Sequence, residues 1–189
     1  MKLFIADAEP ERIRQRFETY PLDGVIVENS SSDALKKIRD CIKEVSELHV
    51  PINAKKADDI VGEAENVFYA LGSNTYAVIS VNDEGMKAMK ILLETSEVPF
   101  TAIDVRTPMQ ALIAGKCGAS YVMPFVNRLD SQNAVAIVKK MFDALNRNGL
   151  ETELIAAHCK TIRQALELCE YGISVAVSPS MLSSLVSDE

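Results

Sequence analysis

The amino-acid sequence predicts an α/β fold of the (β/α)₈ TIM-barrel class, formed by a single domain over residues 1–189. Short apolar runs alternate eight times with stretches of helical periodicity. This alternation requires parallel strands, because each crossover returns the chain to the same edge of the sheet. An open dinucleotide-binding sheet would carry a glycine-rich turn after its first strand, where this chain has Ala6-Asp7-Ala8-Glu9. The 189 residues leave about 24 for each unit, so we expect short loops.

The apolar runs have the length of buried parallel strands. They cover residues 2–5, 24–27, 50–54, 76–81, 99–103, 120–125, 153–157 and 173–177. His49 precedes the third run, and we interpret it as a plain loop residue.

Apolar residues recur three and four positions apart between the runs, which predicts helices. Two examples are the stretches from Ala34 to Val45 and from Ala136 to Leu145. Pro10, Ser32-Asp33, Asn82-Asp83-Glu84 and Thr107-Pro108 mark helix starts. Glycines tolerate positive φ, so they mark helix ends. These glycines are Gly72, Gly118, Gly149 and Gly172.

Composition excludes several classes of function. The chain has 20 Lys and Arg against 27 Asp and Glu, a net charge of −7, which argues against nucleic acid or a membrane surface as partner. No apolar stretch approaches the ~20 residues that span a bilayer, so we expect a cytoplasmic protein. The four cysteines are scattered without a C-x-x-C pair. We therefore predict no metal site and no cofactor.

In a barrel the active site forms where the strands end, at their C-terminal mouth. Alternation along the third predicted strand turns Asn53 and Lys55 toward the barrel interior. The same rule places Glu28 and His158 at the ends of the second and seventh strands. Desolvation inside a mouth favours the free amine that Schiff-base chemistry needs. A Lys55 that reaches solvent or pairs with Glu28 is the alternative, since lysines are seldom buried.

Two features could bind an anion at this mouth. Arg128 follows the sixth strand, where its guanidinium could hold a phosphate in two hydrogen bonds. A helix that begins near Lys160-Thr161 offers free N–H groups after the seventh strand. The alternative for Arg128 is an ordinary surface pair with Asp130.

Five stretches of the chain resemble the small transaldolases and fructose-6-phosphate aldolases, which are (β/α)₈ barrels. The stretches are MKLFI at the start, LDGVIVENS at 22–30, NDEGMKAMK at 82–90, QALIAGKCGASYVMPFVNRLDSQ at 110–132 and LIAAHCKTIRQAL at 154–166. The resemblance implies a sugar-phosphate substrate, a Schiff-base lysine on the fourth strand, and a phosphate contact from Arg128. The chain stops at SSLVSDE, soon after the eighth strand, where the resemblance implies a further C-terminal helix that makes subunit contacts in relatives. A homo-oligomer is left open.

The chain departs from this family at the positions that carry its chemistry. Val78 stands where the resemblance implies the Schiff-base lysine. Apolar residues also replace polar ones at Ala6, Ile26, Ile103 and Phe125. Glu28, Lys55 and His158 are ionisable groups that the family lacks there.

Three functions remain open from the sequence. The first is a barrel that binds a phosphorylated sugar or similar anion, with the aldol chemistry absent or very weak. The second is an active aldolase with a rebuilt site, in which Lys55 supplies the amine or transfers a proton, and Glu28 and His158 act as acid and base. The third is a structural or regulatory scaffold without a ligand, which an ion pair of Arg128 would favour.

Overall fold

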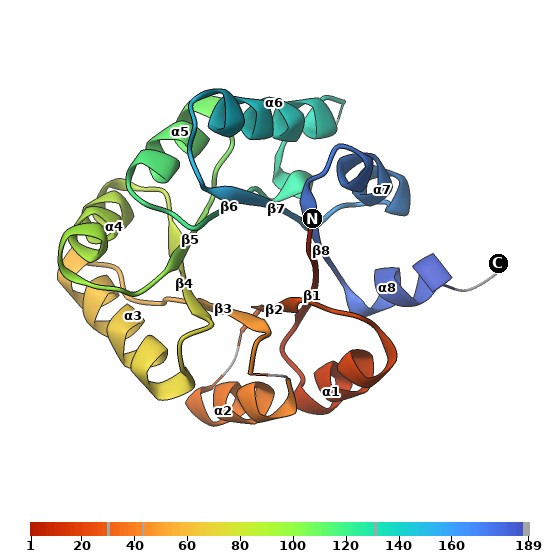
Figure 1. Ribbon diagram of the computed structural model, residues 1–189, viewed down its shortest axis with the longest axis horizontal. Coiled ribbons are helices and arrows are strands. Elements are labelled where there is room, and N and C mark those ends of the chain that lie inside the picture. The colour runs from red at the N-terminus through yellow and green to blue at the C-terminus, as the bar shows by residue number, and fades with distance from the viewer. Residues whose placement is uncertain (30, 43, 131, 187–189) are drawn as a thin grey trace.

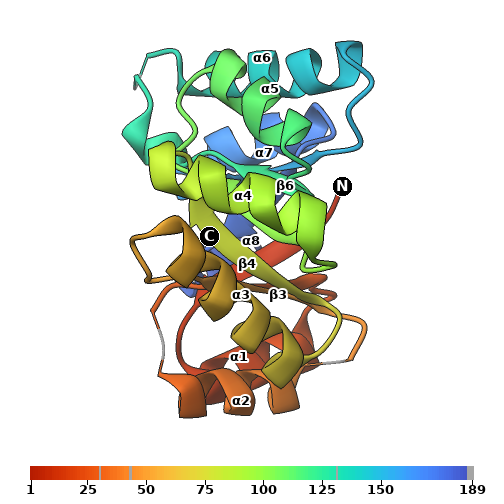
Figure 2. The same ribbon diagram turned by 90° about the vertical axis from the view of Figure 1, so that its left-hand side faces the viewer.

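The protein is a closed barrel of eight parallel strands that follow one another in chain order, with β8 pairing back to β1 (Figure 1). This architecture comes from a computed structural model that describes residues 1–29, 31–42, 44–130 and 132–186. The eight helices form a ring outside the strands (Figures 1 and 2). The barrel predicted from the alternation of strands and helices is confirmed.

The elements alternate strictly along the chain. The strands are β1 (Leu3–Asp7), β2 (Gly24–Val27), β3 (Glu47–Pro51), β4 (Thr75–Ser80), β5 (Phe100–Ile103), β6 (Tyr121–Met123), β7 (Glu153–Ala157) and β8 (Ser174–Val177). The helices are α1 (Pro10–Thr19), α2 (Ser32–Cys41), α3 (Ala57–Leu71), α4 (Asp83–Thr95), α5 (Pro108–Lys116), α6 (Ala134–Arg147), α7 (Ile162–Glu170) and α8 (Pro179–Val186). A short 3₁₀ turn, η1 (Val126–Arg128), follows β6.

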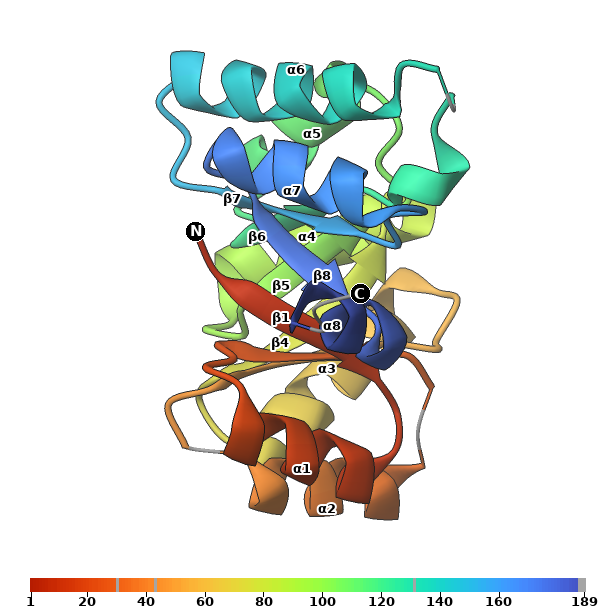
Figure 3. The same cartoon turned by 90° about the vertical axis from the view of Figure 1, so that its right-hand side faces the viewer.

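Closure depends on pairing between the first and last strands, which lie side by side in Figure 3. Leu3, Phe4 and Ile5 pair with Val175, Ala176 and Val177. Along β1, Ile5 packs under the helices, whereas Phe4 and Ala6 point into the barrel. Side chains that alternate in this way give the protein two apolar layers, one inside the barrel and one between barrel and helices.

Several helix boundaries are where the sequence predicts them. Pro10 opens α1, and Gly72, Gly118, Gly149 and Gly172 all have positive φ after helices. The predicted length of α2 is wrong, because this helix ends at Cys41 and leaves Val45 exposed. In the described part of the chain, no helix is long and apolar enough to cross a membrane.

The third strand also differs from its prediction, since β3 covers Glu47–Pro51 rather than 50–54. Beyond Ile52, whose N–H still donates to the carbonyl of Val78, the chain leaves the sheet. The N–H groups of Asn53 and Ala54 donate instead to the carboxylate of Glu63 on α3. A side chain of the neighbouring helix thus captures the N–H groups that would continue the strand.

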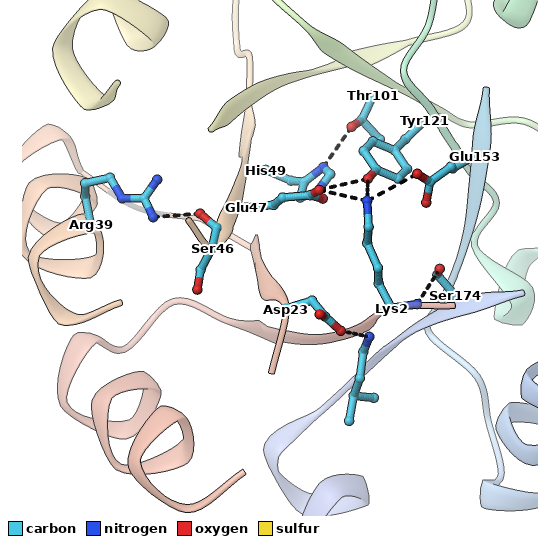
Figure 4. A network of polar contacts seen from close by, with 11 residues as sticks. Lys2, Asp23, Arg39, Ser46, Glu47, His49, Thr101, Tyr121, Glu153 and Ser174 are labelled. Carbon is cyan, nitrogen blue, oxygen red and sulfur yellow. Dashed lines mark hydrogen bonds and ion pairs between the residues drawn. The ribbon is translucent and has the colours of Figure 1, made fainter. Parts of the chain in front are cut away.

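Polar residues at the N-terminal ends of the strands form a network inside the barrel, which we call the floor network (Figure 4). Its members are Lys2, Glu47, His49, Thr101, Tyr121 and Glu153. The Lys2 ammonium donates to Glu47 Oε1 at 2.9 Å, to Glu153 Oε1 at 3.2 Å and to the Tyr121 hydroxyl. The Lys2 ammonium and the largely buried Glu47 carboxylate thus pair with each other, as buried charges require.

His49 is fully buried within the floor network, so its prediction as a loop residue is wrong. Its Nδ1 lies 2.8 Å from Thr101 Oγ1, and its Nε2 lies 3.4 Å from Glu47 Oε2. A neutral imidazole satisfies both contacts by accepting from Thr101 and donating to Glu47. Burial lowers the pKa of His49, although Glu47 opposes this shift. Burial also raises the pKa of the Glu47 carboxyl. Hydrogen bonds from His49 and Lys2 outweigh this effect and hold that pKa below its usual range.

We predict that mild acidification destabilises the protein through His49. The unfolded chain takes up a proton on this imidazole near pH 6.5, and the folded protein does not. The free energy of unfolding should therefore fall from pH 6.5 toward pH 5, by at most about 1.4 kcal/mol per pH unit. Urea unfolding at pH 7, 6 and 5 measures this slope.

The variant His49→Gln should lose this part of the slope, whereas the matched control His158→Gln should keep it. A slope that is identical in His49→Gln and the parent protein would contradict the assignment.

Candidate functional site

The middle of the barrel is apolar at the positions where the sequence departs from the family that it resembles. Ala6, Ile26, Val78, Ile103 and Phe125 all belong to the inner apolar cluster. Val78 is only 5% exposed and lies on β4 opposite Pro51 and Thr101 of the adjacent strands. The interior at this level therefore presents no amine and no hydroxyl from these positions.

A cavity of about 190 Å³ lies above this cluster, at the C-terminal ends of the strands; we call it the mouth cavity. Its walls come from the ends of β1, β2, β6, β7 and β8 and from α8. The lining residues are Ala6, Glu28, Asn127, His158, Cys159, Lys160, Ala176, Ser178 and Met181. Glu28 and His158, two of the predicted site residues, thus meet in one cavity.

His158 is positioned by an unusual backbone conformation and by an aromatic neighbour. Its φ is +55°, and its ring stands edge-on to Phe125 at a centroid distance of 4.8 Å. Non-glycine residues with positive φ are uncommon and occur at functional sites more often than elsewhere. His158 is therefore held at the cavity wall by the turn after β7.

Arg128 makes a different ion pair from the predicted one. Its Nη1 lies 2.8 Å from Asp104 Oδ1, and its guanidinium covers the Phe125 ring at 4.7 Å. Asp130, the predicted partner, instead accepts hydrogen bonds from Asn133 and from the N–H of Gln132. No signal in the sequence distinguished Asp104 from other acidic loop residues.

Asn53 and Lys55 do not point into the barrel as the period-two alternation predicted. Both are exposed, because they follow the end of β3 on the segment that Glu63 holds. Lys55 borders a small cavity together with Ala54, Ile60 and Asn82, next to α3 and α4. Within the described ranges, no ion pair joins Lys55 to Glu28.

Two polar side chains that follow or end a strand, Thr161 and Asp7, accept hydrogen bonds from backbone N–H groups. Thr161 caps α7 by accepting from the N–H of Gln164, close to the start predicted at Lys160-Thr161. Asp7, at the end of β1, accepts from the N–H groups of Ala8 and Glu9 and from the Arg12 guanidinium. Burial opposes the ionised form, but these donors hold the pKa of Asp7 below its usual range.

Comparison with known proteins resolves the family. The model of the family described as Transaldolase/Fructose-6-phosphate aldolase matches residues 12–189. The chain belongs to the transaldolase/fructose-6-phosphate aldolase family. The resemblance inferred from the sequence is thereby confirmed, and family membership supports a place in sugar-phosphate metabolism.

Curated relatives in the transaldolase family share about a third of their residues with this chain. A probable transaldolase of Hydrogenobaculum sp. (strain Y04AAS1) is 34% identical over 186 residues, which cover 95% of this chain and 85% of the relative. A probable transaldolase of Thermoplasma volcanium is 31% identical over 199 residues, which cover 98% and 88%.

Solved structures of more distant proteins share the fold of this transaldolase-family barrel. A putative dihydrodipicolinate synthase family protein from Coccidioides immitis superposes with a TM-score of 0.70 at 7% identity, over 94% of this chain and 66% of its own. A flavocytochrome b2 variant with bound sulfite gives 0.68 at 10% identity, over 97% and 59%. The chain spans less than two thirds of either protein, and the likeness concerns the barrel alone.

The side chains of the site limit which ligands it can hold. Among the described residues, no group of three or more His, Cys, Asp and Glu side chains is placed to hold a metal ion. Glu28 and His158 border the mouth cavity as ionisable side chains, and Lys160, Asn127 and Ser178 bring hydrogen-bond donors to it.

We predict that Asp7→Asn destabilises the protein by about 2 kcal/mol, because it removes a buried charge that Arg12 and two N–H groups solvate. Urea unfolding at pH 7 measures the loss. The exposed neighbour provides a control, since Glu9→Gln should change the free energy of unfolding by less than about 0.5 kcal/mol. Equal losses in the two variants would contradict this role for Asp7.

Proposed function

We propose that this protein binds a phosphorylated sugar or a similar small anion in the mouth cavity and lacks the aldol chemistry of its family. The observation that carries the proposal is Val78, which is buried among apolar side chains at the position that the resemblance assigns to the Schiff-base lysine. A valine has no nucleophile, so the covalent route is lost.

The charge distribution supports an anionic ligand. The loops that join strand ends to the following helices carry more basic than acidic residues, although the chain has a net charge of −7. The basic residues are Lys55, Lys56, Arg106, Arg128 and Lys160, and the acidic ones are Glu9, Glu28, Asp104 and Asp130. Lys160 borders the mouth cavity, where it can contact a small anion, and the N-terminus of α7 adds free N–H groups.

The rebuilt aldolase is the second candidate, and one observation favours it. Glu28 and His158 line the same cavity, as an acid–base pair requires. Lys55 is exposed outside that cavity, which argues against it as the amine. The scaffold without a ligand is favoured by the ion pair between Arg128 and Asp104. Cytoplasmic location and assembly into a homo-oligomer stay predictions from the sequence.

Borohydride trapping separates the two catalytic outcomes. We expect no adduct on any lysine after incubation with dihydroxyacetone, its phosphate or fructose 6-phosphate, and little or no cleavage of fructose 6-phosphate. Intact-mass measurement and peptide mapping detect the adduct. An adduct that maps to Lys55 and disappears in Lys55→Met would establish the rebuilt aldolase, and normal cleavage would overturn the proposal.

Binding of fructose 6-phosphate tests the anion site independently. We expect Arg128→Gln to weaken binding about tenfold, because a guanidinium–phosphate contact is a charge-assisted hydrogen bond. The matched control is Arg106→Gln, which removes an arginine from the neighbouring loop and should change affinity little. Isothermal titration calorimetry measures both. Absence of binding by the parent protein would favour the scaffold.

A further inference from the structure

Arg128 stands beside the mouth cavity rather than in its wall. Asn127, the preceding residue, lines the cavity, and so does His158. The Phe125 ring contacts both the His158 ring, at a centroid distance of 4.8 Å, and the Arg128 guanidinium, at 4.7 Å. Arg128 thus shares a contact with a residue of the cavity wall, while its guanidinium is paired with Asp104.

Asp104 holds the guanidinium in this outer position. The carboxylate follows β5 on a residue with a φ of +60°, and its Oδ1 accepts from Arg128 Nη1 at 2.8 Å. Both side chains are partly exposed, 33% for Asp104 and 54% for Arg128. A partly exposed pair exchanges partners at small desolvation cost, so the bond is reversible.

We propose that Asp104 is an internal competitor for Arg128, a latch that a ligand anion must displace. The inference rests on the proposed function, since it assumes that Arg128 binds the ligand. A ligand carboxylate that replaces Asp104 on the Arg128 guanidinium gains little binding free energy, because both partners carry a single negative charge. A phosphomonoester dianion carries more charge and three acceptor oxygens, so it displaces Asp104 where a carboxylate monoanion does not. The latch lowers the affinity of both kinds of anion by the same factor, so we expect only the more strongly bound phosphomonoester to occupy the site appreciably.

The thermodynamic consequence is specific. The apparent affinity of a ligand is reduced by the fraction of protein in which the binding group is free. Removal of the competing carboxylate should thus tighten anion binding, whereas loss of a merely structural residue would weaken it. Exposed ion pairs have strengths that correspond to a tightening of about two- to fivefold.

Glycerol phosphate is the probe, and glycerate serves as the carboxylate comparison; both are titrated calorimetrically at pH 7.5. Asp104→Asn removes the charge, and asparagine adopts positive φ as readily as aspartate does, so the loop conformation is preserved. Asp130→Asn is the matched control, because it removes an equal charge from the loop that carries Arg128 without touching the guanidinium. Arg128→Gln and the double variant Asp104→Asn/Arg128→Gln complete a cycle.

We expect glycerol phosphate to bind two- to fivefold more tightly to Asp104→Asn, with no change in Asp130→Asn and no tightening in the double variant. The parent protein should bind glycerate far more weakly than glycerol phosphate. Unchanged or weaker binding in Asp104→Asn, with binding still dependent on Arg128, overturns the latch and leaves the proposed function standing. Binding that Arg128→Gln does not weaken overturns both. Equal affinity of the parent for the two probes overturns the selection of dianions.

Discussion

Barrel closure is the constraint on which the rest of this structure depends. A closed sheet has no free edge, so inward side chains from eight strands share one narrow interior. Every polar group in that interior must be paired by another strand. Lys2, Glu47 and Tyr121 meet this requirement at the N-terminal ends of three strands that are far apart in sequence. Their mutual pairing allows charges to lie inside the barrel at all.

The two ends of the barrel solve this problem differently. At the N-terminal end, polar side chains satisfy one another and His49 is held neutral, which suits a structural role. At the C-terminal end, Glu28 and His158 border a cavity, and Arg128 reaches only a partly exposed aspartate. Ionisable side chains that border a cavity are therefore found at the end where barrels bind ligands.

An apolar layer lies inside the barrel between these two ends. Family membership rests on residues 12–189, whereas the resemblance assigns the Schiff-base lysine to a single position, where this chain has Val78. Val78, Ala6 and Ile103 pack that level with apolar side chains within an intact barrel. In the proposed function, the ionisable groups above this layer bind an anion without covalent catalysis.

Local patterns in the sequence determined the eight strand–helix units, the glycine helix ends and the family, because these depend on periodicity and on turn geometry. The same patterns placed Glu28 and His158 at the mouth. Only the tertiary structure decided that Glu63 ends β3 before Asn53 and Lys55, that His49 is buried, and that Asp104 pairs with Arg128. These outcomes depend on contacts between segments distant in the chain, which no local pattern encodes.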